Sequence, residues 1–361
     1  MSTSSRASRS VSLRQPKHSS VTIVLSSGRV RYCEGDTVLG NILLEAKDGW
    51  KHDNIVLVVR GGAEVTLPCP SQSSAPLTAS FGLMEEEILI KPSGYLGHGD
   101  HAIPFSFVVK GIRGASLPET YRGVHVKISY RMSVFVRRGF FSRYLDDTKE
   151  LMIENLTSSN SDVVGLDEFK PFIIVPSHNI NVVDRPRHCL LSFKITGQLG
   201  RRLAVNRPLT GSLVVGESVL PIRSIELCLS RGEIIRNNIP PMNAPGKCDA
   251  RLLHLPPPTF SSLGRNTPSA KQYHHGQQHG FTRVCTEIQT WQVVDGDVMR
   301  GIKIPIRLPL PDRELCVTTE FEGFFKLQFD ITLLIYFMDG SVTSESFPLD
   351  FFRSEKNLAM T

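Results

Sequence analysis

The stretch Val126 to Val136, VKISYRMSVFV, carries an apolar residue at every even position and a polar residue at four of its five odd positions. A second stretch, Phe325 to Leu333, FKLQFDITL, alternates in the same way. A period of two residues is typical of a β-strand with one buried and one exposed face. Long amphipathic helical patterns are missing from the sequence. We therefore expect an almost all-β protein.

Turn signals separate several of these strand-like runs. Asp-Gly pairs occur at Asp48-Gly49, Asp295-Gly296 and Asp339-Gly340. This dipeptide favours tight hairpins, because Gly and Asp tolerate the positive φ that such turns require. Short strands joined by turns of this kind predict a β-sandwich or a β-barrel.

The two halves of the sequence repeat one pattern weakly. Gly40 to Leu44, GNILL, matches Gly211 to Val215, GSLVV, at an offset of 171 residues, and Arg60-Gly61 matches Arg231-Gly232 at the same offset. The offset later rises, to 199 for Lys127 and Lys326. An insertion in the second half explains the increase. The sequence thus predicts two tandem sandwiches of one design.

Segment boundaries follow from this repeat. We expect a disordered basic tail at 1–20, a first immunoglobulin-like sandwich at 21–160, a linker at 161–186, a second sandwich at 187–353 and a tail at 354–361. The polar stretch Asn155 to Phe169 lacks sustained apolar periodicity and marks the junction. A segment rich in Pro and His, 236–282, is the expected insertion.

Composition excludes several functional classes. The net charge of +6 comes from the N-terminal stretch before Glu34, the first acidic residue, so the rest of the chain is formally neutral and a nucleic-acid groove is not expected. Seven cysteines without a CxxC pair predict neither a zinc site nor a disulfide framework, and they indicate a reducing compartment. The apolar stretch Ile331 to Met338 is shorter than the roughly 18 residues that a membrane-spanning helix needs.

Four blocks of sequence resemble the arrestin-like subunit family of retromer and retriever, the endosomal sorting complexes. These blocks are HAIPFSFVVKG (His101 to Gly111), LPETYRGVHVKISYRMSV (Leu117 to Val134), RPLTGSLVV…IRSIELCLSRGE (Arg207 to Glu233) and TEIQTWQVVDGDVMRGIKIPIRLPLP (Thr286 to Pro311). The resemblance covers about Val21 to Arg353 and is closer to the retriever member than to its retromer paralogue. The basic tail and the Pro/His insertion depart from the family pattern.

The resemblance implies a bilobal arrestin-like fold without catalysis or cofactor. It implies a heterotrimer with a helical-solenoid sorting subunit and a metallophosphoesterase-like subunit, within the commander assembly, and indirect contact with a sorting-nexin-type cargo adaptor. Such a complex recycles membrane-protein cargo from endosomes to the plasma membrane. The implied location is cytoplasmic, with peripheral association to endosomes and no nucleic-acid partner.

Five residues are candidates for partner contacts. Ile234 and Ile235, an apolar pair just before the insertion, belong either to the core or to an exposed sheet edge that the solenoid subunit contacts. Asp295, Asp297 and Arg300 lie in the Thr286 to Pro311 block, which the resemblance assigns to the partner-bearing sandwich. Asp295-Gly296-Asp297 lacks the further ligands of a calcium loop, so an ordinary turn is the expected structure there.

No candidate site for metal or catalysis emerges. His274, His275 and His279 lie close together, but a solvated low-complexity loop explains them, because nothing rigid would hold them around a metal ion. The sequence has no GxSxG, HExxH, GxxxxGK[ST] or GxGxxG motif, so we expect no enzyme. A free-standing arrestin-domain adaptor is the alternative, although its usual PPxY motif is missing as well.

Overall fold

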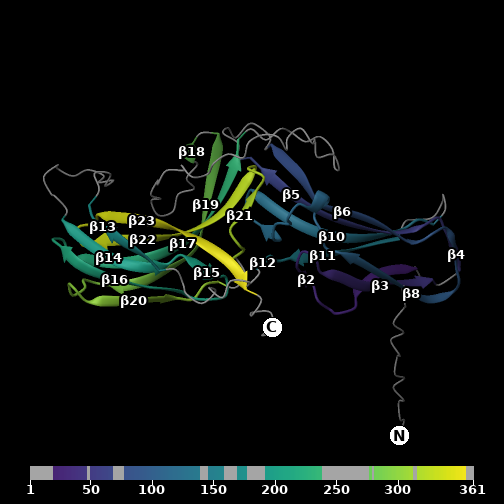
Figure 1. The fold of residues 1–361 in the computed structure, drawn as a ribbon, viewed down its shortest axis with the longest axis horizontal. Helices are drawn as coiled ribbons and strands as arrows, with labels where there is room; N and C mark the ends of the chain where they lie inside the picture. Colours follow the sequence, from purple (N-terminus) through teal and green to yellow (C-terminus); the bar gives the residue numbers. More distant parts are fainter. Residues whose placement is uncertain are drawn as a thin grey trace, which may run out of the picture.

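The computed structural model describes residues 19–46, 49–67, 77–138, 145–157, 169–176, 192–237, 276–278, 280–311 and 315–354. Within these ranges the chain is built from β-strands, apart from the short 3-10 helix η1 (Ile112–Gly114). Two sandwiches lie end to end along the long axis of the molecule (Figure 1). The predicted almost all-β, two-sandwich fold is confirmed.

The N-terminal sandwich consists of two packed sheets. The smaller sheet has the order β1 (Ser20–Leu25), β3 (Thr37–Ala46), β8 (Gly99–Val108). The larger sheet has the order β2 (Arg31–Tyr32), β11 (Leu145–Ile153), β10 (Val126–Val136), β5 (Ile55–Thr66), β6 (Thr78–Lys91), and β9 (Tyr121–Arg122) pairs with β10. A separate pair, β4 (Trp50–His52) and β7 (Gly94–Leu96), lies at the outer end of this sandwich (Figure 1).

The C-terminal sandwich repeats this plan. Its smaller sheet has the order β13 (Phe169–Ile174), β14 (Phe193–Gly200), β16 (Leu209–Ser218), β20 (Lys303–Leu308). Its larger sheet has the order β12 (Leu156–Thr157), β23 (Val342–Ser354), β22 (Phe325–Phe337), β17 (Ile222–Arg236), β19 (Phe281–Asp295), β18 (Gly276–Gln278). In addition, β15 (Arg202–Ala204) pairs with β23, and β21 (Thr319–Phe321) pairs with β22.

The internal repeat has a direct structural counterpart. Strands β3, β5, β8 and β10 of the first sandwich occupy the same places in their sheets as β16, β17, β20 and β22 of the second. Even the short strands agree, because β2 pairs in parallel with β11 and β15 pairs in parallel with β23. The offsets found in the sequence therefore join equivalent strands.

Strand β10 shows why the alternating stretches form strands. Its even residues, from Val126 to Val136, are buried, and its odd residues point to the outer face. Tyr130 faces Gly61 of β5, where an added Cβ would lie 2.3 Å from the Tyr130 ring atom Cδ1. Glycine at position 61 thus makes room for the buried tyrosine ring.

Of the two alternatives for Ile234 and Ile235, the core position is confirmed and the exposed sheet edge is wrong. Both side chains have an exposed fraction of 0%, and β17 is paired with β19 on one side and with β22 on the other. Ile235 lies in the main apolar core. These residues are therefore interior residues of a central strand, because the chain returns as β19 after the insertion and covers the edge.

Three further expectations differ from the structure. The stretch assigned to the linker contains β13, an edge strand that pairs with β14, and only Phe172 and Ile174 in this strand are buried. Strand β12, inside the range predicted for the first sandwich, pairs with β23 of the second. The Asp295-Gly296 turn does not close a hairpin, because β19 and β20 belong to different sheets.

Other turn and insertion predictions have mixed outcomes. The Asp339-Gly340 turn joins β22 to β23 as predicted, with Gly340 at φ +86. Asp48 and most of the predicted insertion, 238–275 and residue 279, lie outside the described residues. Strand β18 and the ends of β17 and β19 lie inside the predicted insertion range, so the sheet extends further into it than its composition indicated.

The candidate functional site at the junction of the sandwiches

The junction between the sandwiches contains a buried carboxylate. Glu233, near the end of β17, has an exposed fraction of 1%. Its Oε1 accepts hydrogen bonds from the Tyr121 hydroxyl at 2.7 Å and the Val124 backbone N–H at 2.9 Å. Its Oε2 accepts from the backbone N–H groups of His125 at 2.6 Å and Val126 at 3.1 Å. One C-terminal side chain thus satisfies four donors of the N-terminal sandwich.

A glycine in the N-terminal sandwich leaves room for the Glu233 carboxylate. Gly123 lies in the turn between β9 and β10, and an added Cβ there would lie 1.8 Å from Oε1 of Glu233. Burial and the neighbouring Glu233 carboxylate raise the pKa of Tyr121, so its hydroxyl stays protonated as a donor. The guanidinium of Arg231 lies 5.2 Å from the centroid of the Tyr121 ring, which adds a cation–π contact.

A second carboxylate points the other way across the junction. Glu119, with an exposed fraction of 2%, belongs to the N-terminal half and accepts from Nε of Arg353 at 2.7 Å and from the Val317 N–H at 3.1 Å. The Asn155 N–H donates to the same carboxylate at 2.9 Å. Arg353 also lies 3.7 Å from Glu154, so one cation is shared by two carboxylates.

Burial and the neighbouring charges shift the pKa values of two groups at this second contact, Arg353 and Cys316. Burial disfavours the charged form of Arg353, but the adjacent Glu119 carboxylate more than offsets burial, so the pKa of this guanidinium is raised. Burial, followed by Glu119, raises the pKa of the Cys316 thiol to about 12. Cys316 is therefore a protonated, unreactive core residue.

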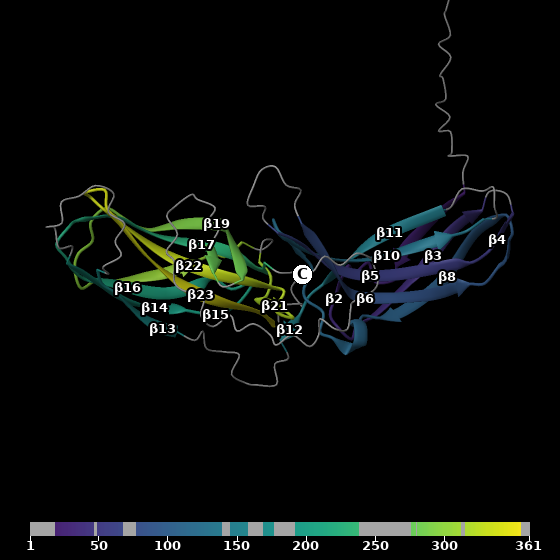
Figure 2. The ribbon, with the colours of Figure 1, turned by 90° about the horizontal axis from the view of Figure 1, so that it is seen from above.

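Aromatic packing accompanies the polar contacts. The ring of Phe81 in β6 lies 4.7 Å from the ring of Phe324 and 6.0 Å from the ring of Phe321, centroid to centroid. Figure 2 shows β21 close to the junction with the N-terminal sandwich. The buried apolar residues of both sandwiches form one continuous cluster. The junction thus combines apolar burial with directional bonds.

The predicted residues Asp295, Asp297 and Arg300 lie elsewhere, at the connection from β19 to β20. Asp297 accepts from the Ile222 N–H at 3.0 Å and from Nη1 of Arg300 at 2.9 Å. Its pKa is lowered, first by the Ile222 bond and then by Arg300. Nη2 of Arg300 also reaches the Ser218 carbonyl oxygen at 3.4 Å. These residues fix the connection against the β16–β17 turn.

Asp295 lines a shallow cleft of about 370 Å³ beside this connection. Its carboxylate accepts from the Gln292 amide at 3.2 Å. The other lining residues are Arg223, Ser224, Glu226, Gln292 and Tyr336. The structure thus brings the three predicted polar residues near one another and keeps Ile234 and Ile235 in the interior.

Among the residues that the structure describes, no three His, Cys, Asp or Glu side chains gather in a way that could hold a metal ion. His274, His275 and His279 lie outside those residues. In the described ranges no helix has the length and apolar character required to cross a bilayer.

The junction carboxylates were not among the residues predicted from the sequence. Glu119 and Glu233 lie inside two of the blocks that carry the family resemblance, next to alternating strands. The available signal was Glu233 itself, a charged residue followed directly by the apolar pair Ile234 and Ile235. A charge at such a position needs a buried partner, but the sequence does not show which residues supply it.

The chain is similar in sequence to a known protein along most of its length. The chain is 27% identical over 335 residues to vacuolar protein sorting-associated protein 26C of Dictyostelium discoideum. The aligned region covers 89% of this chain and 95% of that protein, so both sandwiches and their junction are included. No known family model matches the chain. In its two arrestin-like sandwiches and in its sequence along nearly its whole length, the chain is similar to the arrestin-like vacuolar protein sorting subunits, and in particular to a 26C member.

Proposed function

We propose that the protein is a non-catalytic scaffold subunit of a retriever-like endosomal sorting complex, which recycles membrane-protein cargo to the plasma membrane. The observation that carries this proposal is the similarity to a vacuolar protein sorting subunit over both sandwiches. A scaffold needs surfaces held at fixed positions. The bonds of Glu233 and Glu119 across the junction meet that need.

The chemistry of the described residues supports a binding role. The Glu233 and Glu119 carboxylates are occupied by donors from both halves of the chain, and neither lines the cleft at Asp295. Catalytic acids and bases need access to a substrate as well as a perturbed environment. The buried carboxylates of this protein therefore support structure.

The C-terminal sandwich is the proposed contact for the helical-solenoid subunit. Because Ile234 and Ile235 are interior residues, the contact moves to the loops fixed by Asp297 and Arg300. Large apolar side chains are exposed there: Val219 at 71%, Met299 at 76%, Ile302 at 52% and Met338 at 58%. We call these four residues the C-terminal tip.

Hydrogen bonds join the loops of the C-terminal tip into one surface. The Met338 N–H donates to the Pro221 carbonyl at 3.0 Å, and the Gly301 N–H donates to the Val215 carbonyl at 2.9 Å. Exposed apolar side chains on a rigid surface are typical anchors of protein contacts. The metallophosphoesterase-like subunit would join through the solenoid, and a sorting-nexin-type adaptor would bind indirectly, at the cytoplasmic face of endosomes.

Affinity purification of the tagged full chain, followed by mass spectrometry, tests the proposed function. Recovery of a helical-solenoid subunit and a metallophosphoesterase-like subunit of the retriever type supports it. Recovery of retromer subunits instead would assign the chain to the retromer alternative. If no solenoid subunit is recovered, the complex-subunit proposal is wrong and a free-standing arrestin-domain adaptor becomes the better account.

A substitution pair locates the contact. Val219→Asp with Met299→Asp places two charges on the C-terminal tip and should abolish recovery of the solenoid subunit, since a charge at a desolvated contact is strongly unfavourable. Leu89→Asp, on an exposed position of β6 in the other sandwich, is the matched control and should retain the subunit. Loss of binding in the control alone would place the contact on the N-terminal sandwich.

A further inference from the structure

The cleft beside the C-terminal tip is built from three neighbouring strands of the larger C-terminal sheet, β17, β19 and β22. Every residue that lines it has a polar side chain: Arg223, Ser224, Glu226, Gln292, Asp295 and Tyr336. Its volume of about 370 Å³ lies at the lower end of the range for ligand sites, about 300–1,000 Å³. Such a space fits a single polar side chain better than a large apolar ligand.

The strand register brings the two carboxylates of the cleft close together. Ser224 of β17 pairs with Asp295 of β19 and with Tyr336 of β22. Glu226 lies on the same face of β17 as Ser224, because Ile225 between them points into the core. Diagonal neighbours on one face of a sheet are about 7–8 Å apart. Glu226 and Asp295 can therefore both reach one group that lies between them.

Ser224 is a buried hydroxyl without a partner. Its exposed fraction is 7%, and it lines the cleft. Other buried hydroxyls of this sheet are bonded, because Thr332 shares a hydrogen bond with Ser346 at 2.9 Å and Thr282 donates to Asn237 at 2.6 Å. Among the described residues, the Ser224 hydroxyl has no such bond. Buried polar groups normally have a partner, so this hydroxyl indicates that a bound group completes the cleft.

The balance of charge in the cleft is negative. Glu226 and Asp295 face one cation, Arg223, which forms no ion pair with any residue that the structure describes. Burial, followed by the Glu226 carboxylate, raises the pKa of Tyr336. The hydroxyl of Tyr336 therefore stays protonated, and the shift shows that the charge of Glu226 acts inside the cleft. Two carboxylates and one cation attract a further cation.

The charges around the cleft do not reverse this balance. Arg300 is bound to Asp297 at 2.9 Å, and Arg283, on the same outer face as the cleft, is bound to Asp330. Both cations are thus neutralised by carboxylates of their own. Glu287 of β19 adds a further negative charge, which also contributes to the raised pKa of the cleft tyrosine.

The cleft and the C-terminal tip form one continuous surface. The Gly296 N–H donates to the carbonyl oxygen of Arg223 at 2.7 Å, so the connection that carries Met299 is bound to the cleft wall. Met338 of the tip follows Tyr336 by two residues. A partner whose apolar side chains cover the tip therefore places its neighbouring side chains over the cleft.

We propose that the cleft receives an arginine side chain of the protein that docks on the C-terminal tip. A guanidinium has five N–H donors in a planar fork, so it can bond two carboxylates and a hydroxyl at once. A metal ion would find only two carboxylates in the cleft, and an anion would meet two like charges. The identity of the partner rests on the proposed function, in which the helical-solenoid subunit binds the tip.

Binding of N-acetyl-arginine amide to the purified full chain tests the site without any partner protein. The chain has seven tyrosines, and 3-fluorotyrosine labels all of them. The ¹⁹F signal that disappears in Tyr336→Phe reports on the cleft. N-acetyl-arginine amide should shift this signal with a dissociation constant on the order of 1 to 10 mM, as a single side-chain contact allows. N-acetyl-citrulline amide has the same shape without the charge and should not shift it.

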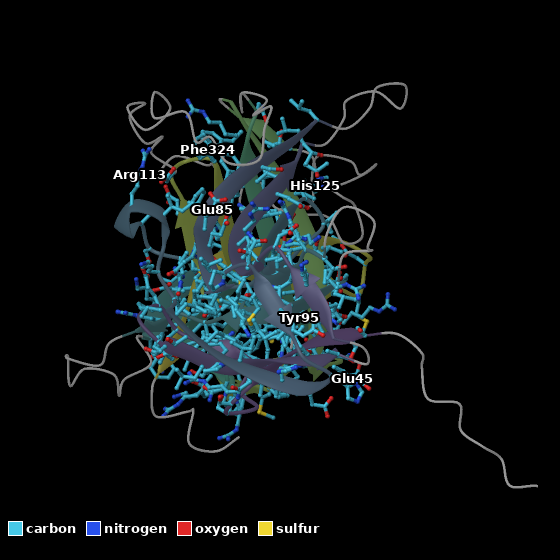
Figure 3. All side chains as sticks on the ribbon, turned by 90° about the vertical axis from the view of Figure 1, so that its right-hand side faces the viewer. Glu45, Glu85, Tyr95, Arg113, His125 and Phe324 are labelled. Carbon is cyan, nitrogen blue, oxygen red and sulfur yellow. The ribbon has the colours of Figure 1, made fainter. Side chains whose placement is uncertain are left out.

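Substitutions separate a cation site from an anion site. Glu226→Gln with Asp295→Asn should weaken the binding of N-acetyl-arginine amide at least about tenfold, since the charged acceptors are lost. Arg223→Ala should keep or strengthen binding, because the resident cation is removed. Glu320→Gln on β21 of the same sandwich and Glu85→Gln on β6 of the other sandwich (Figure 3) are the controls and should match wild type. Circular dichroism checks that all variants are folded.

Affinity purification distinguishes a failure of this inference from a failure of the proposed function. The tagged full chain with Glu226→Gln and Asp295→Asn should recover about a tenth of the solenoid subunit that wild type recovers, or less. If wild type recovers no solenoid subunit, the proposed function is wrong, and N-acetyl-arginine amide still tests the cleft. The arginine contact is wrong if the cleft variant recovers as much subunit as wild type. It is also wrong if the cleft signal does not respond to N-acetyl-arginine amide, responds equally to the citrulline compound, or loses its response in Arg223→Ala.

Discussion

Glu233→Gln is the sharpest test of the junction. The substitution keeps the size of the side chain but replaces one carboxylate oxygen by an NH₂ group. Each carboxylate oxygen of Glu233 accepts two hydrogen bonds. The new amide nitrogen, which is itself a donor, would therefore face two donors. These are Tyr121 and Val124 if it replaces Oε1, and His125 and Val126 if it replaces Oε2. Two buried groups then lose their acceptor.

The expected loss in the free energy of unfolding follows from the number of hydrogen bonds that the substitution removes. A buried donor without an acceptor costs about 1–3 kcal/mol, and removal of one partner from a buried charged contact costs about 3–5 kcal/mol. We therefore expect Glu233→Gln to lower the free energy of unfolding by about 3 kcal/mol. Tyr121→Phe removes one donor and leaves the three backbone bonds, so a loss of about 1.5 kcal/mol is expected.

Chemical denaturation with tryptophan fluorescence measures the effect on each sandwich separately. The chain has two tryptophans, Trp50 in the N-terminal sandwich and Trp291 in the C-terminal one. Two variants, each with one tryptophan replaced by Phe, report on one sandwich each. With the native Glu233, the two sandwiches should unfold at the same denaturant concentration, and with Glu233→Gln they should unfold at different concentrations. Glu64→Gln is the control, because Glu64 is exposed and its ion pair with Lys127 spans 3.8 Å.

One result would refute this account of the junction. If Glu233→Gln changed the free energy of unfolding by less than about 0.5 kcal/mol, as surface substitutions do, and both probes still unfolded together, the carboxylate would not couple the sandwiches. Coupling would then have to come from the aromatic contacts around Phe81 alone.

Gly61→Ala should lower the free energy of unfolding by about 2 kcal/mol, because its Cβ would overlap the Tyr130 ring. Gly232→Ala meets only the Arg283 side chain, at 3.2 Å, and should lower it by no more than about 1 kcal/mol. Urea titrations of the two variants measure the difference. His52 is buried, and burial followed by Lys91 lowers its pKa, so stability should fall as the pH drops below about 6.5, and His52→Leu should flatten that part of the pH profile. Deletion of 240–273, which spares both ends of the insertion, should leave the melting temperature nearly unchanged, and a loss above about 2 kcal/mol would reveal a structural role.

The strands were predictable because their information is local. The alternation in Val126 to Val136 fixes a strand and its buried face without knowledge of the neighbours, and β10 has those bounds. The repeat at an offset of 171 residues was also visible, because equivalent strands kept their glycines and apolar runs. What local pattern cannot supply is the order of strands, so the sequence left Ile234 and Ile235 undecided between the core and a sheet edge.

The junction was not predictable for a related reason. Glu233 finds its donors at Tyr121 and Val126, more than a hundred residues earlier in the chain. A sequence shows that a carboxylate precedes two apolar residues, but it does not show which backbone N–H groups meet it. Strand β13 was missed because only two of its residues are buried, too few for a recognisable period.

The two junction carboxylates have a consequence for how the surfaces of this protein work together. Apolar contacts such as Phe81 against Phe324 are not directional and tolerate sliding. Hydrogen bonds to Glu233 and Glu119 are directional, and they lie at two separate points with the acceptors on opposite sides. Two such points oppose rotation as well as separation of the sandwiches. The outer surfaces of the N-terminal sandwich and the C-terminal tip therefore keep a constant relative position, so a partner bound to one surface also determines where the other surface lies.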